Sequence, residues 1–355
     1  MIVGVKTDPG YDVVIEPGAS RRLPALAEGA DRVAIVRPAA LAEAADALAA
    51  TLDKRVVQIE IPDAEAAKTP RVLADAWDAL AAATFTRNDL VVGLGGGATT
   101  DLAGFIAATW LRGVRYVAVP TSVLAAVDAA VGGKTGINLS AGKNLVGAFY
   151  EPAAVLCDLD LLATLPPDEV SSGLAEVIKC GFIADTAILD LVAEDPDDAR
   201  NVASDRLADL VARAVRVKAD VVAADLREST STSGNVGREA LNYGHTLGHA
   251  IEKTQDYTWR HGAAISVGMV WAAEVSRRLL GLDHGVVQRH RDLLSAVGLP
   301  TRHDGDWPEL RSAMSIDKKA RGSALRLIGL TAPGHVDLIT APDEAVLADA
   351  YRALS

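Results

Sequence analysis

Cysteine and aromatic residues are scarce in this sequence of 355 residues. The only cysteines, Cys157 and Cys180, lie far apart and form no CxxC pair, which fits a reducing compartment better than a disulfide framework. No uncharged apolar stretch reaches the roughly 18 residues of a membrane span, since GFIAATWLRG is interrupted by Arg112. The N-terminal segment, with Lys6 and Asp8, lacks the apolar core of a signal peptide. We therefore expect a cytoplasmic protein without a membrane partner.

Positive charge is also in deficit. The chain has 35 basic and 47 acidic residues, a formal net charge of −12. That charge would repel a phosphate backbone, and no basic patch offsets it, so we expect no nucleic-acid partner. A few lysines and arginines that converge in one cleft could still bind a small anion.

The length predicts about two domains.

The hydrophobic pattern changes near residues 160–170. Before this point, β-branched runs alternate with Ala-rich amphipathic segments, which is typical of βαβ units and a mainly parallel sheet. After it, the segments are longer and periodic at 3.6 residues, which predicts a mostly helical second half. The expected strands are 13–16, 32–36, 55–61, 89–94, 115–119 and 154–156. The expected helices are 41–52, 71–83, 169–182, 206–224, 245–253 and 263–280.

Two glycine-rich segments are candidate ligand sites. Residues 89–101, DLVVGLGGGATTD, predict a strand, a glycine turn and a helix start, which suits a pyrophosphate, although tight packing alone could also require the glycines. Residues 128–144, DAAVGGKTGINLSAGKN, place Asp128, Lys134, Asn138, Lys143 and Asn144 among four glycines. Converging donors there predict a phosphate or carboxylate site, the alternative being a solvated turn.

Three of the seven histidines lie within 17 residues, which suggests a metal site. His245 and His249 are four residues apart and would share one face of a helix, as metal ligands often do and as core residues also do. His261 follows in WRHGAA, and spacing alone leaves open which two histidines bind metal. Glu176, one helical turn from Lys179 in an apolar stretch, is the best acidic ligand, because buried carboxylates are seldom left unpaired.

Nine segments, in this order, resemble the 3-dehydroquinate synthase family over roughly residues 60–330. They are GGGATTDLAGF, TWLRG, VPTSVLAAVDAAVGGKTGIN, GKNLVGAF, TLPPDE, GLAEVIK, REALNYGHTLGHAIE, HGAAISVGM and DKK. The resemblance implies a Rossmann-like NAD-binding α/β domain over 1–165 and an α-helical domain over 166–355 that binds metal and substrate. It implies one NAD and one Zn²⁺, or Co²⁺ in its place, in the cleft between them. It also implies conversion of the keto-acid sugar phosphate DAHP to 3-dehydroquinate and phosphate, through transient oxidation, elimination, re-reduction and aldol closure.

Site residues follow from the resemblance, position by position. The implied metal ligands are Glu176, His245 and His261, so His249 would face the substrate. The implied NAD contacts are Glu65, Lys68, Gly95, Gly96, Gly97, Asp101, Thr121, Ser122, Lys143 and Thr164. The implied substrate contacts are Asp128, Lys134, Asn144, Lys179, Lys218, Arg238, Asn242, His249 and one of Lys318 and Lys319. Arg112 of the TWLRG segment would reach a neighbouring subunit's site, which implies a homodimer.

The sequence departs from the family pattern at two places. Arg37-Pro38 follows the first Rossmann-like strand where many relatives carry a ribose-binding acid, and STSTSGNVG separates Glu228 from Arg238. The alternatives are an aminodehydroquinate, valiolone or inosose synthase, and a polyol dehydrogenase, which would release NADH. Retention of Lys134, Asn144, Lys218, Arg238, Asn242 and His249 favours a carboxylate-bearing substrate. The complete metal set argues against a non-catalytic relative.

Overall fold

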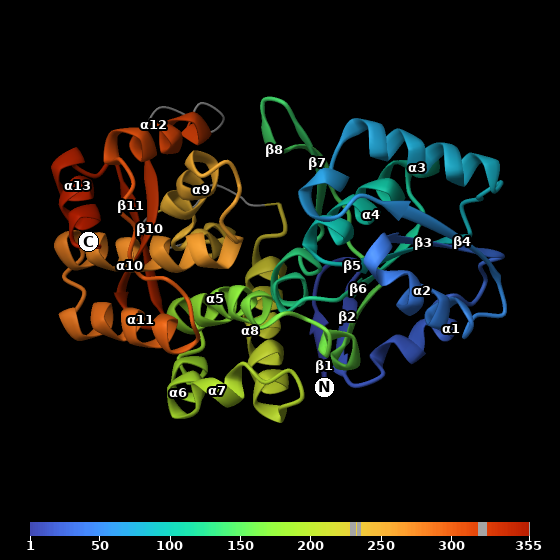
Figure 1. Ribbon diagram of the computed structural model, residues 1–355, viewed down its shortest axis with the longest axis horizontal. Coiled ribbons are helices and arrows are strands. Elements are labelled where there is room, and N and C mark those ends of the chain that lie inside the picture. Colours follow the sequence, from blue (N-terminus) through green and yellow to red (C-terminus); the bar gives the residue numbers. More distant parts are fainter. Residues whose placement is uncertain (228–231, 233–235, 319–324, 355) are drawn as a thin grey trace. The chain divides into compact units, whose positions relative to one another are not determined.

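The chain divides into two compact units. The computed structural model describes residues 1–227, 232, 236–318 and 325–354. The first unit comprises Met1–Pro166 and Lys218–Ala223, and the second comprises Pro167–Val217 and Ala224–Ser355. One short piece of a long helix therefore belongs to the first unit, although the rest of that helix belongs to the second. Figure 1 labels the helices and strands of each unit.

A seven-stranded sheet forms the centre of the first unit, in the order β1-β2-β9-β6-β5-β3-β4. Only the β1–β2 pair is antiparallel. The strands are β1 (Ile2–Val5), β2 (Tyr11–Glu16), β3 (Arg32–Pro38), β4 (Arg55–Ile61), β5 (Leu90–Gly95), β6 (Arg115–Pro120) and β9 (Ala154–Asp158). All six strands expected from the sequence are present, and the edge strand β1 was not expected.

Helices cover both faces of this sheet (Figure 1). On one face, the short helices η1 (Ala19–Arg22) and η2 (Ala39–Leu41) accompany α1 (Leu23–Leu26) and α2 (Ala42–Ala49). There, alternate strand residues such as Val33 and Ile35 form one core with Leu23 and Leu48. The other face carries α3 (Pro70–Ala82) and α4 (Gly97–Thr109), as right-handed crossovers require when the chain reverses its direction across the sheet after β4.

A second, two-stranded sheet in the first unit was not predicted. It is the hairpin β7 (Lys134–Leu139) and β8 (Gly142–Phe149), which lies in the glycine-rich stretch. A Cβ on Gly147 would lie 2.1 Å from the Thr135 carbonyl oxygen, so glycine permits this close strand pairing. The remaining short helices are η3 (Ala64–Ala67), η4 (Trp110–Arg112), the π-helix η5 (Ala125–Ala129) and η6 (Leu159–Leu162).

The second unit is helical around the buried helix α10. Its helices are α5 (Pro167–Ile183), α6 (Ala187–Glu194), α7 (Pro196–Ala199), α8 (Asp205–Ala224), η7 (Arg238–Asn242), α9 (His245–Thr254), α10 (His261–Leu279), α11 (His284–Ala296), α12 (Trp307–Lys318) and α13 (Glu344–Arg352). The predicted fold class, an α/β part followed by a helical part, is confirmed. Among the described residues, no helix combines the length and apolar character that crossing a bilayer requires.

The second unit also contains a β-hairpin among its helices. It pairs β10 (Arg326–Ala332) with β11 (His335–Thr340) through a turn at Pro333 and Gly334, where Gly334 has a φ of 80°. Proline followed by a glycine of positive φ is the signature of a type II turn. That dipeptide between two β-rich runs was the available sequence signal for this hairpin.

Candidate functional site

The glycine turn of the first unit joins the end of β5 to the start of α4. A Cβ on Gly95 would lie 2.5 Å from Thr99 Oγ1, so packing alone excludes a larger residue there. At Gly96 the nearest atom would be Ser122 Oγ at 3.9 Å, so packing does not require this glycine. The space above Gly96 and the N–H groups that open the 13-residue helix α4 fit a bound pyrophosphate.

Three more of the predicted NAD contacts follow the ends of neighbouring strands. Thr121 and Ser122 come directly after β6, and the Thr121 amide donates to the Gly95 carbonyl over 3.0 Å. Ser122 Oγ accepts from the Ala125 amide at 3.1 Å and so caps the next turn. Thr164 is exposed and follows η6, beyond β9, and the structure gives it no contact with the other two.

A buried lysine connects the remaining predicted NAD contacts to the β7–β8 hairpin. Lys68 is 1% exposed, and its Nζ lies 2.5 Å from Asp101 Oδ2 and also donates to Asn144. Burial raises the pKa of Asp101 to about 6, against the opposing charge of Lys68. Glu65 Oε2 accepts a hydrogen bond from the Asn138 side-chain amide at 2.6 Å, and Lys143 Nζ lies 3.9 Å from Glu65 Oε1. The Asn144 backbone amide donates to Asn138 Oδ1 at 2.9 Å, so Glu65, Lys68, Asp101, Lys143 and Asn144 belong to one polar network.

Predicted substrate contacts of the first unit centre on Asp128 in η5. The Lys218 ammonium, from the part of α8 that belongs to this unit, pairs with the Asp128 carboxylate and donates to its backbone carbonyl. Lys218 is 6% exposed, so the carboxylate compensates a nearly buried charge. Lys134 begins β7 and is exposed. Arg112 lies in the separate turn η4, also exposed, with a φ of 68°.

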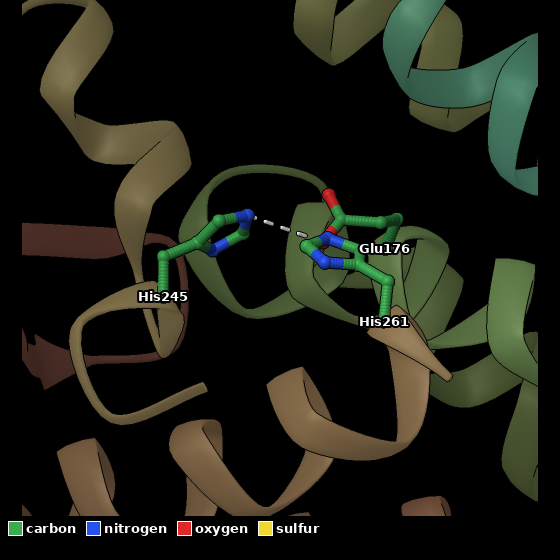
Figure 2. A group of neighbouring side chains, drawn as sticks. All are labelled: Glu176, His245 and His261. Carbon is green, nitrogen blue, oxygen red and sulfur yellow. Dashed lines mark ion pairs between the residues drawn. The ribbon is translucent and has the colours of Figure 1, made fainter. Parts of the chain in front are cut away.

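The predicted metal ligands of the second unit lie together at the starts of two helices and the middle of a third (Figure 2). Glu176 Oε1, on α5, lies 3.5 Å from His245 Nε2 and 3.7 Å from His261 Nε2. His245 begins α9 and His261 begins α10. One carboxylate oxygen and two imidazole nitrogens within 4.8 Å of one another form a donor set that suits Zn²⁺.

Glycine at two helix crossings explains why these three side chains meet. A Cβ on Gly262 would lie 2.0 Å from the Ser172 carbonyl oxygen, so α10 begins against the turn of α5 that precedes Glu176. A Cβ on Gly268 would lie 2.0 Å from the Gly244 carbonyl oxygen, so α9 begins against α10. The two close crossings bring His261 and His245 to the same carboxylate.

Hydrogen bonds orient both imidazoles toward Glu176. His245 Nδ1 lies 3.2 Å from the Tyr243 carbonyl oxygen, which can only accept, so Nδ1 carries a proton and Nε2 faces the carboxylate. Burial, and then the charge of Lys179, lower the pKa of His245 well below its ordinary value. Both effects keep this imidazole neutral, which is the form that coordinates metal.

His261 is held between two carboxylates. Its Nδ1 lies 3.2 Å from Glu252 Oε2, and its Nε2 faces Glu176. Burial opposes the charged form, but the carboxylates of Glu176 and Glu252 raise the pKa of His261 to about 10. A pair of carboxylates that favours a proton here also favours a divalent cation.

Glu252, which is 7% exposed, is a further member of this cluster that the sequence pattern did not predict. Its spacing was the available signal. His245, His249 and Glu252 occupy positions i, i+4 and i+7 of α9, which share one helix face. His249, Glu252 and His261 also form a second group of neighbouring ligand atoms.

The other predicted substrate contacts of this unit differ in exposure. Lys179, 2% exposed, pairs with Glu176 Oε2, while His249 is exposed. Arg238, 3% exposed, begins η7 and donates to the Leu226 carbonyl at 2.7 Å, and Asn242 ends η7. Lys318 ends α12, whereas Lys319 and most of STSTSGNVG lie outside the described residues.

The sequence matches two family models and is similar to known proteins over its whole length. The family model for the 3-dehydroquinate synthase N-terminal part matches residues 58–172, and the model for the C-terminal part matches residues 173–320. The 3-dehydroquinate synthase of Cutibacterium acnes is 53% identical over 361 aligned positions, which cover 100% of this chain and 99% of that protein.

Solved structures share the fold. The 2-epi-5-epi-valiolone synthase of Streptomyces hygroscopicus, solved with NAD⁺ and Zn²⁺ bound, superposes with a TM-score of 0.88 and 25% identity, covering 97% of this chain and 96% of that one. A 2-deoxy-scyllo-inosose synthase, in complex with carbaglucose-6-phosphate, NAD⁺ and Co²⁺, gives a TM-score of 0.86 at 24% identity and covers 100% of both chains.

Proposed function

Because this chain belongs to the 3-dehydroquinate synthase family, we propose that it converts DAHP to 3-dehydroquinate and inorganic phosphate. The observation that carries the proposal is the complete cluster of Glu176, His245 and His261. A relative that had lost catalysis would have no need to keep three ionisable side chains together in the interior. Burying such groups without a ligand is unfavourable.

In this proposal Glu176, His245 and His261 hold Zn²⁺ or Co²⁺, and the second unit supplies the metal site. The pairing of Lys179 with the second oxygen of Glu176 leaves Oε1 directed at the two imidazoles. Three protein ligands leave a coordination position for a substrate oxygen, as catalytic zinc sites require. The valiolone synthase structure, which holds NAD⁺ and Zn²⁺, supports the choice of metal.

NAD binds the first unit in this proposal, at the edge where β5 and β6 end. Gly96 leaves room for the pyrophosphate, and the Lys68 network fixes the adjoining hairpin. When bound, NAD would supply a hydride acceptor and donor, and the metal would supply a Lewis acid for the alcohol being oxidised. The contacts proposed for NAD are Glu65, Lys68, Gly95, Gly96, Gly97, Asp101, Thr121, Ser122, Lys143 and Thr164.

The chain's cations and amides orient the substrate. Its carboxylate and phosphate need donors that stay fixed through several chemical steps, and buried, ion-paired lysines supply them without reorganisation. Lys179, held by Glu176, and Lys218, held by Asp128, meet this requirement. The other proposed contacts are Lys134, Asn144, Arg238, Asn242, His249 and one of Lys318 and Lys319.

We also propose a cytoplasmic homodimer. Both cysteines are buried and neither forms a disulfide, in agreement with a reducing compartment. Exposed Arg112 is the residue expected to enter a partner's site, and exposed Leu111 lies beside it.

The test is to incubate the purified chain with DAHP, Zn²⁺ and a catalytic trace of NAD. Phosphate release is followed directly, and 3-dehydroquinate is followed through added dehydroquinase. We expect equal amounts of both products without accumulation of NADH, because the hydride returns to the substrate. Stoichiometric NADH would instead identify a polyol dehydrogenase. Turnover of only the amino analogue of DAHP, or of a neutral sugar phosphate, would identify another cyclase.

A further inference from the structure

The end of β3 lacks the acid that dinucleotide-binding folds use to hold the adenosine ribose. In such folds an Asp or Glu on the strand beside the glycine turn accepts from the ribose hydroxyls. Here β3 is that neighbouring strand, because it pairs with β5 through Val36 and Gly93, and it ends in Arg37-Pro38. Two residues beyond this register pair, Pro38 and Gly95 end their strands at the same edge of the sheet.

A carboxylate reaches this edge from the next strand. Arg37 of β3 and Glu60 of β4 are register partners, and Arg37 Nη1 lies 2.6 Å from Glu60 Oε2. The Arg37 side chain is 10% exposed, and Gln58 Oε1 accepts from its Nε and Nη2 at 3.1 and 3.0 Å. Asp46 holds Gln58 in turn, over 2.6 Å. The nearly buried Arg37 side chain thus fixes the position of the Glu60 carboxylate.

The clamped carboxylate remains open to solvent and lines a hollow. The Glu60 side chain is 62% exposed. The hollow measures about 540 Å³, within the range of small-molecule sites. Its lining residues are Pro38, Ala39, Ala40, Glu60, Ile61, Pro62 and Asp63, which combine an apolar wall with two acids. Apolar surface suits the adenine ring, and a fixed carboxylate suits ribose hydroxyls.

We infer that Glu60, positioned by Arg37, accepts hydrogen bonds from the adenosine ribose of NAD and so replaces the acid missing from β3. The same carboxylate repels a 2′-phosphate and selects NAD over NADP. The inference rests on the proposed function in taking a nicotinamide dinucleotide as the cofactor.

The opposite reading gives Arg37 a 2′-phosphate to bind, as arginines near this position do in NADP-dependent folds. The contacts argue against it. Glu60 and Gln58 accept hydrogen bonds from all three guanidinium nitrogens, and the side chain is nearly buried. A 2′-phosphate would have to displace the Glu60 carboxylate to reach them.

The experiment measures dissociation constants of the full-length chain for NAD⁺, NADP⁺ and NAD⁺ with a 2′-deoxyadenosine ribose, by calorimetry. Glu60→Gln keeps the size of the side chain and removes its charge. We expect it to weaken NAD⁺ binding about ten-fold, the effect of losing a charge-assisted hydrogen bond. The preference for NAD⁺ over NADP⁺ should fall by at least as much. Glu28→Gln is the matched control, an exposed glutamate before the amino end of β3, at the opposite sheet edge.

Unchanged NAD⁺ affinity and unchanged NAD⁺ preference in a folded Glu60→Gln chain would overturn the inference. Equal binding of NAD⁺ and its 2′-deoxy analogue by the unaltered chain would overturn it as well, whatever the stability of the variant. The third comparison is the binding of the 2′-deoxy analogue to the Glu60→Gln variant. If the loss of binding free energy there is smaller than the sum of the losses from the variant alone and from the analogue alone, the inference is supported, because Glu60 and the 2′-hydroxyl then act together. An unaltered chain that binds neither dinucleotide would overturn the proposed function too.

Discussion

At the scale of single residues, the metal cluster depends on a carboxylate that is not itself one of the three proposed ligands. Glu252 Oε2 accepts from His261 Nδ1, and this bond fixes both the tautomer and the direction of Nε2. An outer carboxylate of this kind raises the basicity of the ligand and is as much a part of a zinc site as the ligand. Glu252 therefore acts on the metal through His261.

We expect Glu252→Gln to weaken Zn²⁺ binding by about ten-fold to a hundred-fold, the usual cost of losing such a partner. Glutamine is similar in size and can still accept from Nδ1, so the change tests charge rather than packing. Competition with a chromogenic chelator measures the affinity independently of activity. Glu169→Gln is the control, because Glu169 pairs with Arg260, next to His261, at 2.7 Å. Equal affinities in the two variants would contradict a role for Glu252.

At the scale of elements, the turn between β5 and α4 combines a glycine that packing requires with one that it does not. A Cβ on Gly95 meets Thr99 Oγ1 at 2.5 Å and Thr99 Cβ at 2.7 Å, whereas Gly96, with a φ of −71°, has room for a methyl group. Substitutions at these two adjacent residues can therefore distinguish an effect on stability, expected at Gly95, from an effect on ligand binding, expected at Gly96.

Gly95→Ala should lower the free energy of unfolding by about 1–3 kcal/mol, the usual effect of overpacking. Gly96→Ala should leave stability within about 0.5 kcal/mol and weaken NAD⁺ binding, because its methyl group projects into the space proposed for the pyrophosphate. Urea unfolding and NAD⁺ titration measure the two effects. A Gly96→Ala chain that binds NAD⁺ normally would contradict the proposed phosphate site.

Helix α11 packs against α5 through a buried, neutral histidine. The ring of His290 stacks on Phe182 with centroids 3.4 Å apart. Its Nδ1 donates to the Val286 carbonyl at 2.7 Å, and its Nε2 lies 2.9 Å from the Tyr243 hydroxyl. Burial lowers the pKa of His290 from 6.5 to about 3.

This shift makes stability depend on pH. Because the pKa is lower in the folded chain, protons favour the unfolded chain, and stability present above pH 6.5 is lost as the pH falls toward 3. Between pH 6.5 and 5 the loss should be about 1.5 kcal/mol. His290→Gln should remove that part of the pH dependence, whereas exposed His284→Gln on the same helix should keep it. Urea unfolding at the two pH values compares them, and parallel curves for all three chains would contradict the assignment.

Local pattern predicted the elements whose residues face a core, and missed those that depend on distant pairing. Strands such as β3 and β5 are continuous apolar runs, and helices such as α10 repeat their apolar residues over many turns. The β7–β8 hairpin lacks such a pattern. Its glycines weaken strand propensity, and large apolar side chains such as Leu145 and Phe149 are exposed. The set of metal ligands came from family resemblance, because spacing alone left the choice of histidines open.

At the scale of the whole molecule, Arg112 is the residue proposed to connect two copies of the chain. Leu111 and Arg112 both have positive φ, at 49° and 68°, followed by Gly113 at 125°. Consecutive non-glycine residues in this region cost about 1–3 kcal/mol each and tend to occur at functional sites. We therefore expect Arg112→Ala to reduce turnover strongly while the chain stays folded and dimeric, as circular dichroism and light scattering would show.

Two inactive variants can show whether a site is shared. His261→Ala should abolish turnover by removing a metal ligand, and Arg112→Ala should act on the partner's site. When the two chains are mixed and their subunits exchanged, about half of the dimers contain one of each, and each mixed dimer regains one complete site. Phosphate release should then recover to about a quarter of the unaltered level. If Arg112 served its own subunit, both sites of every mixed dimer would be defective, and no recovery would occur. Absence of recovery in a mixture in which a mass tag on one variant shows that mixed dimers have formed would therefore reject the shared site, whatever the loss in Arg112→Ala alone.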